Sequence, residues 1–434
     1  MSKKHHSATT KTRSPIRGEP LPLEFPGLHY LDEREIEAVV RVLRRRSPFR
    51  YYGIDSPGEV SAFESEFGDF LGVSHALGVN SGTAALHVAL AALGVGPGQE
   101  VIIPAYMWAS VPAAVVNLGA IPVLADIDDT FCLDPKDTAN RITPRTAGII
   151  AVHMSGAQAD APALREVAQA NKLFLLEDCA QCVGGSIDGK KTGTFGDMAV
   201  FSFQINKNMT CGEGGCVVTN DERLYKRAFA CHDAGFLRDA SGRELFADPA
   251  LYLWGHGCRL DELRAAILRV QLAKLPDIVS QMRKSKYRIR KALENFPQIR
   301  LRRIVDPAGD TGSFLICTFH DAGAARRASE ELRSEGIVTW PQGVTNVVMN
   351  KWGLHIYYNI LSLVYRTSAD SFGFPWNLAE NKHSTVQYGR GTCPNADDLF
   401  DRSLLLAIPS CLSSEDESDI IRAFTRVLDL KGAS

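Results

Sequence analysis

The chain has 434 residues, of which 45% are hydrophobic and 23% charged, and its formal net charge is −2 at pH 7. This length can bury a large core in two or three domains, and the near-neutral charge argues against proteins that bind nucleic acid or a membrane surface, which usually carry a basic face. No run of about eighteen apolar residues appears, so we expect no membrane-spanning segment.

Residues 1–20, MSKKHHSATTKTRSPIRGEP, form a basic and polar start. They lack the apolar segment of a secretory signal. Because such a composition offers little apolar surface to bury, we expect this tail to be disordered.

The ten cysteines are scattered through apolar segments instead of forming a regular framework. This favours reduced thiols and a cytoplasmic location. One pair, CAQC at 179–182, has the spacing of a thiol redox motif, but a redox function is the less favoured interpretation. Because no paired CxxC or HxxxH spacing supports a zinc site, we expect no metal.

From about residue 75 onward, short apolar runs alternate with helical stretches. The predicted strands are EVIIP (100–104), IPVLADI (121–127), AGIIAVH (147–153), KLFLLED (172–178) and AVFSF (199–203). Apolar periodicity predicts helices over residues 83–96 and 162–172. This repetition predicts an α/β fold with a mostly parallel sheet and helices on both faces. Ligands of such sheets bind beyond the carboxyl ends of the strands.

A long predicted helix, roughly residues 262–295, links this region to the rest of the chain. We therefore expect a large domain over residues 21–285 and a smaller α+β domain over residues 286–434. Residues 340–392 are the least regular segment and are rich in Trp, Tyr, His and Asn. A loop of this length is usually functional or disordered, and its aromatic residues argue against disorder.

Side chains at four strand ends together suit one cofactor. NSGTAAL (80–86) begins a helix whose free backbone amides can face a phosphate, and Trp108 follows a strand, where its ring can stack on a heterocycle. Asp178 ends a strand and can keep a pyridine nitrogen protonated. At the end of the next strand, Ser202 offers a phosphate donor and Lys207 an amine that becomes a nucleophile when it loses a proton. These features indicate pyridoxal 5′-phosphate held as a Schiff base.

Each feature has an ordinary explanation when taken alone. Trp108 would more often be a core aromatic, Asp178 a cap or ion-pair partner, and Lys207 a surface residue, while SGT before a helix is common capping chemistry. Only their joint arrangement favours the cofactor. A near match to a nucleotide-binding loop, GSIDGKKT (185–192), is rejected because Lys191 occupies the required Ser/Thr position.

From about residue 25 to the C-terminus, the chain is similar to the DegT/DnrJ/EryC1/StrS sugar aminotransferases. The segments that carry the resemblance are EVSAFESEFGDFLGVSHALGVNSGTAALHVAL, EVIIPAYMWAS, GAIPVLADID, EDCAQCVGG, FGDMAVFSFQINKNMTCGEGG and RLDELRAAI. The resemblance implies the aspartate-aminotransferase-like fold type I. It also implies a homodimer whose active sites are shared between the subunits.

The resemblance assigns roles to individual residues. It implies that Lys207 holds the cofactor and moves protons, and that Asp178 pairs with the pyridinium nitrogen. It further implies that Trp108 stacks on the ring and that Gln181 lies near the ring hydroxyl. The expected phosphate ligands are Gly82, Thr83 and Ser202.

One position departs from the family pattern. The family usually has an asparagine two positions before the arginine of RLDEL, and this asparagine reaches the phosphate of the partner subunit. Here the stretch reads WGHGCRLDEL, with Gly257 at that position. Either His256 or a backbone amide replaces the asparagine, or the partner chain supplies fewer phosphate ligands.

The implied reaction is transamination from L-glutamate or L-glutamine to a keto or aldehyde sugar. Relatives that carry histidine in place of the lysine run a dehydration instead, so Lys207 favours transamination. A non-catalytic regulator that only binds the cofactor is the alternative from a different class. The intact lysine, aspartate and phosphate set argues against it.

The segment that we expect to recognise the acceptor sugar is residues 372–413, which is longer than the minimal ending of the family. Trp376, His383 and Arg390 could recognise a carboxylate and hydroxyl groups, although a packed structural loop is an equal alternative. This ending resembles the branch that makes 8-amino-3,8-dideoxy-octulosonate, an amino sugar of lipopolysaccharide. The favoured acceptor is therefore 3,8-dideoxy-8-oxo-octulosonate, and the alternatives are a nucleotide-linked 4-keto sugar and an aminocyclitol ketone.

Overall fold

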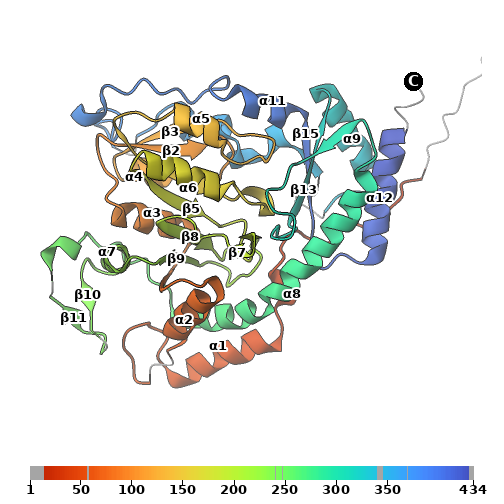
Figure 1. The fold of residues 1–434 in the computed structure, drawn as a ribbon. Helices are drawn as coiled ribbons and strands as arrows, with labels where there is room; N and C mark the ends of the chain where they lie inside the picture. Colours follow the sequence, from red (N-terminus) through yellow and green to blue (C-terminus); the bar gives the residue numbers. More distant parts are fainter. Residues whose placement is uncertain are drawn as a thin grey trace, which may run out of the picture.

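The computed structural model describes residues 14–55, 58–239, 241–246, 248–339, 346–368 and 370–429. Its centre is a seven-stranded sheet with the strand order β1-β9-β8-β5-β4-β2-β3 (Figure 1). The strands of this sheet are β1 (His75–Val79), β2 (Glu100–Pro104), β3 (Ile121–Ala125), β4 (Thr146–Val152), β5 (Phe174–Asp178), β8 (Met198–Ser202) and β9 (Gly215–Thr219).

The sheet is mostly parallel, as the sequence predicts. Strands β3, β2, β4, β5 and β8 pair in parallel, whereas β9 pairs antiparallel with both β8 and β1. Every residue of β2, β3, β8 and β9 is buried, which explains why these strands read as continuous apolar runs. All five predicted strands are confirmed; β1 and β9 are additional strands that the sequence analysis did not assign.

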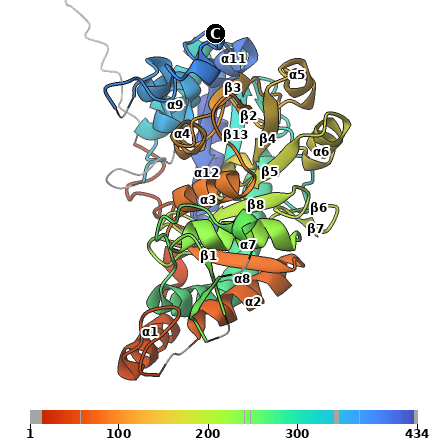
Figure 2. The same cartoon turned by 90° about the vertical axis from the view of Figure 1, so that its left-hand side faces the viewer.

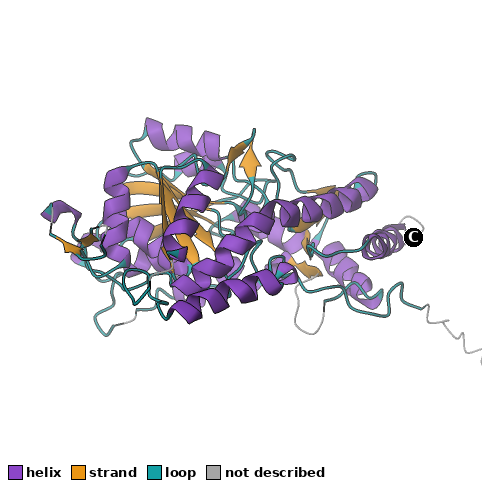
Figure 3. Cartoon of the chain, turned by 90° about the horizontal axis from the view of Figure 1, so that it is seen from below, coloured by secondary structure: helices purple, strands orange, loops and turns teal. Residues whose placement is uncertain are grey.

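Helices cover both faces of the sheet (Figure 3). Along β8 the side chains alternate: Ala199 and Phe201 pack in the cluster with α2 and α8, and Val200 packs in the cluster with α3 and α7. The helices of this region are α1 (Glu33–Arg45), α2 (Glu59–Leu71), α3 (Gly82–Ala92), α4 (Ser110–Asn117), α5 (Pro135–Asn140), α6 (Ala161–Ala170), α7 (Glu222–His232) and α8 (Glu262–Leu293). Two short hairpins complete it, β6 (Ser186–Ile187) with β7 (Lys190–Lys191) and β10 (Leu237–Arg238) with β11 (Glu244–Leu245).

Helix α8 joins two hydrophobic cores, and Figure 1 shows it running from α1 and α2 to α12. Its end, with Ile289 and Leu293, packs in a second core. That core covers an antiparallel sheet of order β12-β13-β15-β14. The elements of this part are β12 (Ile299–Leu301), β13 (Phe314–Phe319), α9 (Ala322–Ser334), β14 (Asn346–Val348), β15 (Ser403–Ala407) and α12 (Ser414–Asp429). Among the described residues no helix is both long and apolar enough to cross a bilayer.

The start of the described chain is anchored to the second core. Arg17 forms ion pairs with Asp416 at 2.6 Å and Asp419 at 3.2 Å, and its backbone N–H donates to the carbonyl oxygen of Glu335 at 3.1 Å. Where the sequence predicts a disordered tail over residues 1–20, residues 14–20 are therefore tied down, because α12 presents acidic side chains to this arginine. Residues 1–13 lie outside the described residues.

Much of the irregular segment, residues 340–392, packs on the large core, while its strand β14 belongs to the smaller sheet. Its described part contains the short helix α10 (Leu361–Val364). The helix that follows the segment, α11 (Pro394–Arg402), lies next to β3 in Figure 2. Met349, Ile356 and Tyr357 are buried members of the large core. Residues 340–345 and 369 lie outside the described residues. The segment thus forms part of the wall above the central sheet.

Candidate active site

A cavity of about 280 Å³ lies beyond the carboxyl ends of β5 and β8 and at the start of α3. This is the edge at which ligands of parallel sheets bind. Its lining includes all seven residues that the resemblance assigns to the cofactor, namely Gly82, Thr83, Trp108, Asp178, Gln181, Ser202 and Lys207. The fold therefore brings together side chains that lie far apart in the sequence.

One end of the cavity is suited to an anion. Ser81 caps α3 by accepting a hydrogen bond from the N–H of Ala84 at 3.1 Å, and the helix dipole favours negative charge at this end. The hydroxyl oxygens of Thr83 and Ser110 lie 2.7 Å apart. A Cβ atom on Gly82 would stand 2.7 Å from the Cβ of Ser202, so only glycine lets β8 approach the helix start this closely.

The glycine-rich turn after Lys207 has a related explanation. A Cβ atom on Gly215, the first residue of β9, would lie 2.4 Å from the carbonyl oxygen of Ser81. The absence of a side chain lets β9 run directly under the loop that precedes α3. GEGG (212–215) thus allows β9 to pack directly against the backbone at the anion-binding end.

Asp178 is a buried carboxylate at the end of β5. One of its oxygens accepts a hydrogen bond from the N–H of Ala180 at 3.0 Å, and this is the only hydrogen bond of its side chain within the described part of the chain. Burial raises its pKa, while the Ala180 amide and the positive charge of Lys207 oppose that rise. Such a carboxylate gains from a cationic partner in the cavity.

Lys207 follows β8 in a turn closed by a hydrogen bond from its N–H to the carbonyl oxygen of Gln204 at 3.0 Å. Burial lowers the pKa of its amine, and Asp178 and Glu213 act in the opposite direction. A lowered pKa increases the fraction of neutral amine, which is the nucleophilic form.

The side of the cavity near Gln181 is completed by His355, which sequence reasoning missed. The Oε1 atom of Gln181 accepts the N–H of Ser155 at 3.0 Å, so its Nε2 faces His355 Nε2 at 3.2 Å. The His355 ring lies 4.8 Å from the Trp108 ring and stacks on Trp352 at 4.5 Å. Desolvation lowers the pKa of His355 to about 4.

Backbone hydrogen bonds fix the position of His355. Met107 N–H donates to the His355 carbonyl oxygen at 3.1 Å, and Tyr357 N–H donates to that of Ala105 at 3.2 Å. The irregular segment thereby pairs with the chain just after β2. The only sequence signal for this residue was the aromatic and histidine content of residues 340–392.

Trp376, His383 and Arg390, the three tentative substrate residues, do not line this cavity. Trp376 donates its indole N–H to the carbonyl oxygen of Thr367 at 3.2 Å and lines a separate hollow. Arg390 pairs with Asp401, and His383 is exposed. Their substrate role stays a prediction.

The two cysteines of the CAQC motif face the core. Cys179 and Cys182 are both buried and neither lines the cavity. Burial raises the pKa of each thiol, which keeps both in the unreactive protonated form. His256, a possible substitute for the missing asparagine, faces His87 of its own chain, and its role toward a partner subunit stays untested.

A comparison with protein families decides what this arrangement represents. The model of the DegT/DnrJ/EryC1/StrS aminotransferase family matches residues 30–342. The chain belongs to this family. The family is pyridoxal-phosphate-dependent, and the cavity fits that cofactor: an anion-binding helix start, a buried carboxylate with one hydrogen bond and a desolvated lysine lie on one wall.

Individual relatives agree with the assignment. The chain is 41% identical to 3-amino-5-hydroxybenzoate synthase of Amycolatopsis mediterranei, over 59% of this chain and 64% of the relative. It is 38% identical to L-glutamine:2-deoxy-scyllo-inosose aminotransferase of Streptomyces kanamyceticus, over 60% and 62%, and 36% identical to GDP-perosamine synthase of Vibrio cholerae, over 52% and 59%. The matches thus span less than two thirds of each relative.

A solved structure extends the likeness over nearly the whole fold. The crystal structure of 3-amino-5-hydroxybenzoic acid synthase superposes with a TM-score of 0.74 and 27% identity, covering 96% of this chain and 100% of that protein. The fold is therefore that of the type I pyridoxal-phosphate enzymes, as the sequence implies.

Proposed function

We propose that the protein is an aminotransferase that moves an amino group from L-glutamate or L-glutamine to the carbonyl group of a sugar or cyclitol. One observation carries this proposal. Asp178 ends strand β5, and Lys207 follows the neighbouring parallel strand β8. Both residues line one cavity together with the N-terminus of α3. Lysine, carboxylate and anion site are what a phosphorylated pyridine aldehyde requires.

Lys207 has two tasks in this proposal. Its Nζ would hold the cofactor covalently between turnovers. Once the amine of the donor has displaced it, the same atom would take a proton from the substrate carbon and deliver that proton to the cofactor. Burial, which lowers its pKa, supports the neutral form needed for both tasks.

Asp178 would accept a hydrogen bond from the protonated ring nitrogen of the cofactor and balance its charge. The bound cofactor supplies an electron-withdrawing ring that stabilises negative charge on the substrate carbon. The hydrogen bond from Ala180 keeps the carboxylate fixed at the cavity wall. Gly82, Thr83 and Ser202 would hold the phosphate, and Trp108 would cover the ring.

The donor and acceptor rest on weaker support. One relative is named as a glutamine-dependent aminotransferase of 2-deoxy-scyllo-inosose, and another as a synthase of GDP-perosamine. The resemblance of residues 372–413 supports 3,8-dideoxy-8-oxo-octulosonate as a first acceptor and lipopolysaccharide synthesis as its use. An aminocyclitol ketone and a nucleotide-linked 4-keto sugar are equal alternatives.

The two half-reactions test the proposal separately. Protein loaded with pyridoxal phosphate is mixed with glutamate or glutamine, and conversion to the aminated cofactor is followed by absorbance. Each candidate acceptor is then added, and return of the starting spectrum is measured. No conversion with any amino donor would contradict an aminotransferase and favour the non-catalytic regulator.

We also infer a cytoplasmic homodimer with the domain division given by the sequence. All ten cysteines are free, which suits a reducing compartment. Phe246 and Trp254 are 81% and 93% exposed near the projecting β10–β11 hairpin, and large exposed apolar side chains mark association surfaces. Light scattering on the purified protein would measure its mass; a monomer at working concentration would contradict the dimer.

A further inference from the structure

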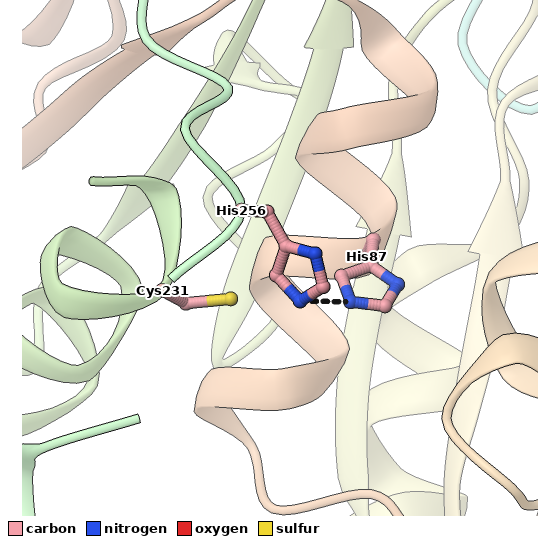
Figure 4. Close-up of side chains that lie close together, drawn as sticks. All are labelled: His87, Cys231 and His256. Atoms are coloured by element: carbon pink, nitrogen blue, oxygen red, sulfur yellow. Dashed lines mark hydrogen bonds between the residues drawn. The ribbon is translucent and has the colours of Figure 1, made fainter. Parts of the chain in front are cut away.

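Three potential metal ligands meet outside the cavity: His87, Cys231 and His256 (Figure 4). The Nε2 atoms of the two histidines are 3.0 Å apart. One ligand atom from each of the three residues lies within 4.8 Å of the other two. The figure shows both rings and the thiol turned toward the same space between two helices and a loop.

The backbone that carries these residues is held in place. His87 lies within α3 and Cys231 near the end of α7, and the two helices pack against each other. The N–H of His256 donates to the carbonyl oxygen of Cys231 at 2.8 Å. Two residues later, the N–H of Cys258 donates to the carbonyl oxygen of His232 at 2.9 Å. The ligands are thus arranged by the fold and do not depend on a flexible loop.

Within the described ranges, the side chains of His87 and His256 hydrogen-bond only to each other, and the Cys231 thiol makes no hydrogen bond. A second cluster of His153, Glu177 and Cys179 differs in this respect. There the glutamate accepts three backbone N–H groups and the histidine, and the other histidine nitrogen accepts the N–H of Ala159. Its lone pairs are occupied, so it is not a candidate.

We propose that His87, Cys231 and His256 bind one Zn²⁺ ion. One sulfur and two imidazole nitrogens suit zinc, which takes nitrogen and sulfur ligands in tetrahedral geometry. Bonds of about 2.0–2.1 Å to nitrogen place two tetrahedral ligands a little over 3 Å apart, close to the separation found here. On binding, the thiol of Cys231 releases its proton to solvent and the sulfur becomes a thiolate ligand.

The fourth position would be taken by water, because His256 is exposed while Cys231 is buried. None of the three residues lines the cavity. The ion would therefore act as a clamp that ties the loop before α8 to α3, the helix whose first turn forms the anion-binding end. This inference does not rest on the proposed transamination.

The test measures zinc directly in the full-length, cofactor-loaded protein. Protein stripped with a chelator is dialysed, supplied with one equivalent of ZnSO₄ and examined by metal analysis and X-ray absorption at the zinc edge. We expect one zinc per chain, with one sulfur at about 2.3 Å and two nitrogens at about 2.0–2.1 Å. A zinc coordination shell without sulfur would overturn the proposal. Zinc bound only by the His5–His6 pair would give that result.

Variants identify the ligands. Cys231→Ser should remove the sulfur from the shell, and His256→Ala should weaken zinc binding tenfold or more, by analogy with the losses seen even for outer-shell changes. Cys411→Ser and His320→Ala, at exposed positions elsewhere, should leave binding unchanged. Because His256 is exposed, its variant should fold even if the serine variant does not. Unchanged zinc binding in His256→Ala would contradict the site.

Discussion

The side-chain amide of Gln181 donates a hydrogen bond to His355, with 3.2 Å between the two Nε2 atoms, across 174 positions of sequence. His355 Nδ1 lies 3.1 Å from the carbonyl oxygen of Trp352 and therefore carries the proton, which leaves Nε2 as the acceptor. This contact joins the motif-bearing wall of the cavity to the irregular segment, so each fixes the orientation of the other.

His355→Phe should weaken cofactor binding by about tenfold. Phenylalanine retains a ring beside Trp108, but it removes the acceptor that orients the Gln181 amide toward the cofactor, and a typical hydrogen bond contributes about 0.5–1.5 kcal/mol. Equilibrium dialysis of pyridoxal phosphate measures the effect. The double variant with Gln181→Ala should lose less than the sum of the two single variants, since the lost contact is shared; fully additive losses would contradict the coupling.

Lys207→Ala should abolish covalent attachment of pyridoxal phosphate and steady-state transamination. The variant loses the only amine that the cavity lining supplies. Intact-protein mass spectrometry after borohydride reduction checks the attachment. Lys190→Ala, at an exposed lysine of β7, is the matched control and should keep the adduct; an adduct that persists in Lys207→Ala would refute the assignment.

Asp178→Asn should lower the rate of the glutamate half-reaction by about 10²–10³-fold, the usual cost of removing one preorganised electrostatic partner. The amide keeps the shape and can still accept the Ala180 N–H, but it cannot balance a protonated ring nitrogen. Stopped-flow absorbance measures the rate, and Asp178→Glu tests position against charge. A rate within threefold of the native value would argue against this pairing.

Arg390→Ala should change both half-reactions little. The arginine is engaged by Asp401 on the surface and stands over the Tyr358 ring at 5.2 Å, and exposed ion pairs contribute less than about 1 kcal/mol. Asp401→Asn should behave alike. If Arg390→Ala instead slowed only the turnover of an acidic keto sugar, this would support the substrate role predicted from the sequence.

Stability should fall on acidification through the His355 ring. Its pKa is lowered to about 4 in the folded protein, against about 6.5 in an unfolded chain. The unfolded state therefore binds the proton first, so this contribution is complete above about pH 6.5 and is lost as the pH falls toward 4. Urea unfolding from pH 7 to pH 4 should show a smaller loss in His355→Phe than in the native protein. Equal slopes would show that other groups dominate.

The elements of the large domain were predictable because their signals are local. Strands buried on both faces need continuous apolar runs, and β2 matches its predicted range from Glu100 to Pro104. The cofactor wall was predictable for a related reason. Parallel strands end at one edge of the sheet, so Asp178 and Lys207 must approach each other once the strand order is set.

Other features were decided only when distant segments packed together. His355 reaches the cavity through backbone pairing with residues 105–107, and Arg390 is drawn away from it by Asp401. His87, Cys231 and His256 follow no metal-binding spacing because each stands on a different element. Chain order by itself determined the family, the central sheet and the lysine–aspartate pair, since these depend on periodicity and strand ends. Contacts that depend on how loops and side chains pack, such as that of Gln181 with His355, needed the tertiary structure, because no local pattern encodes which surfaces will meet.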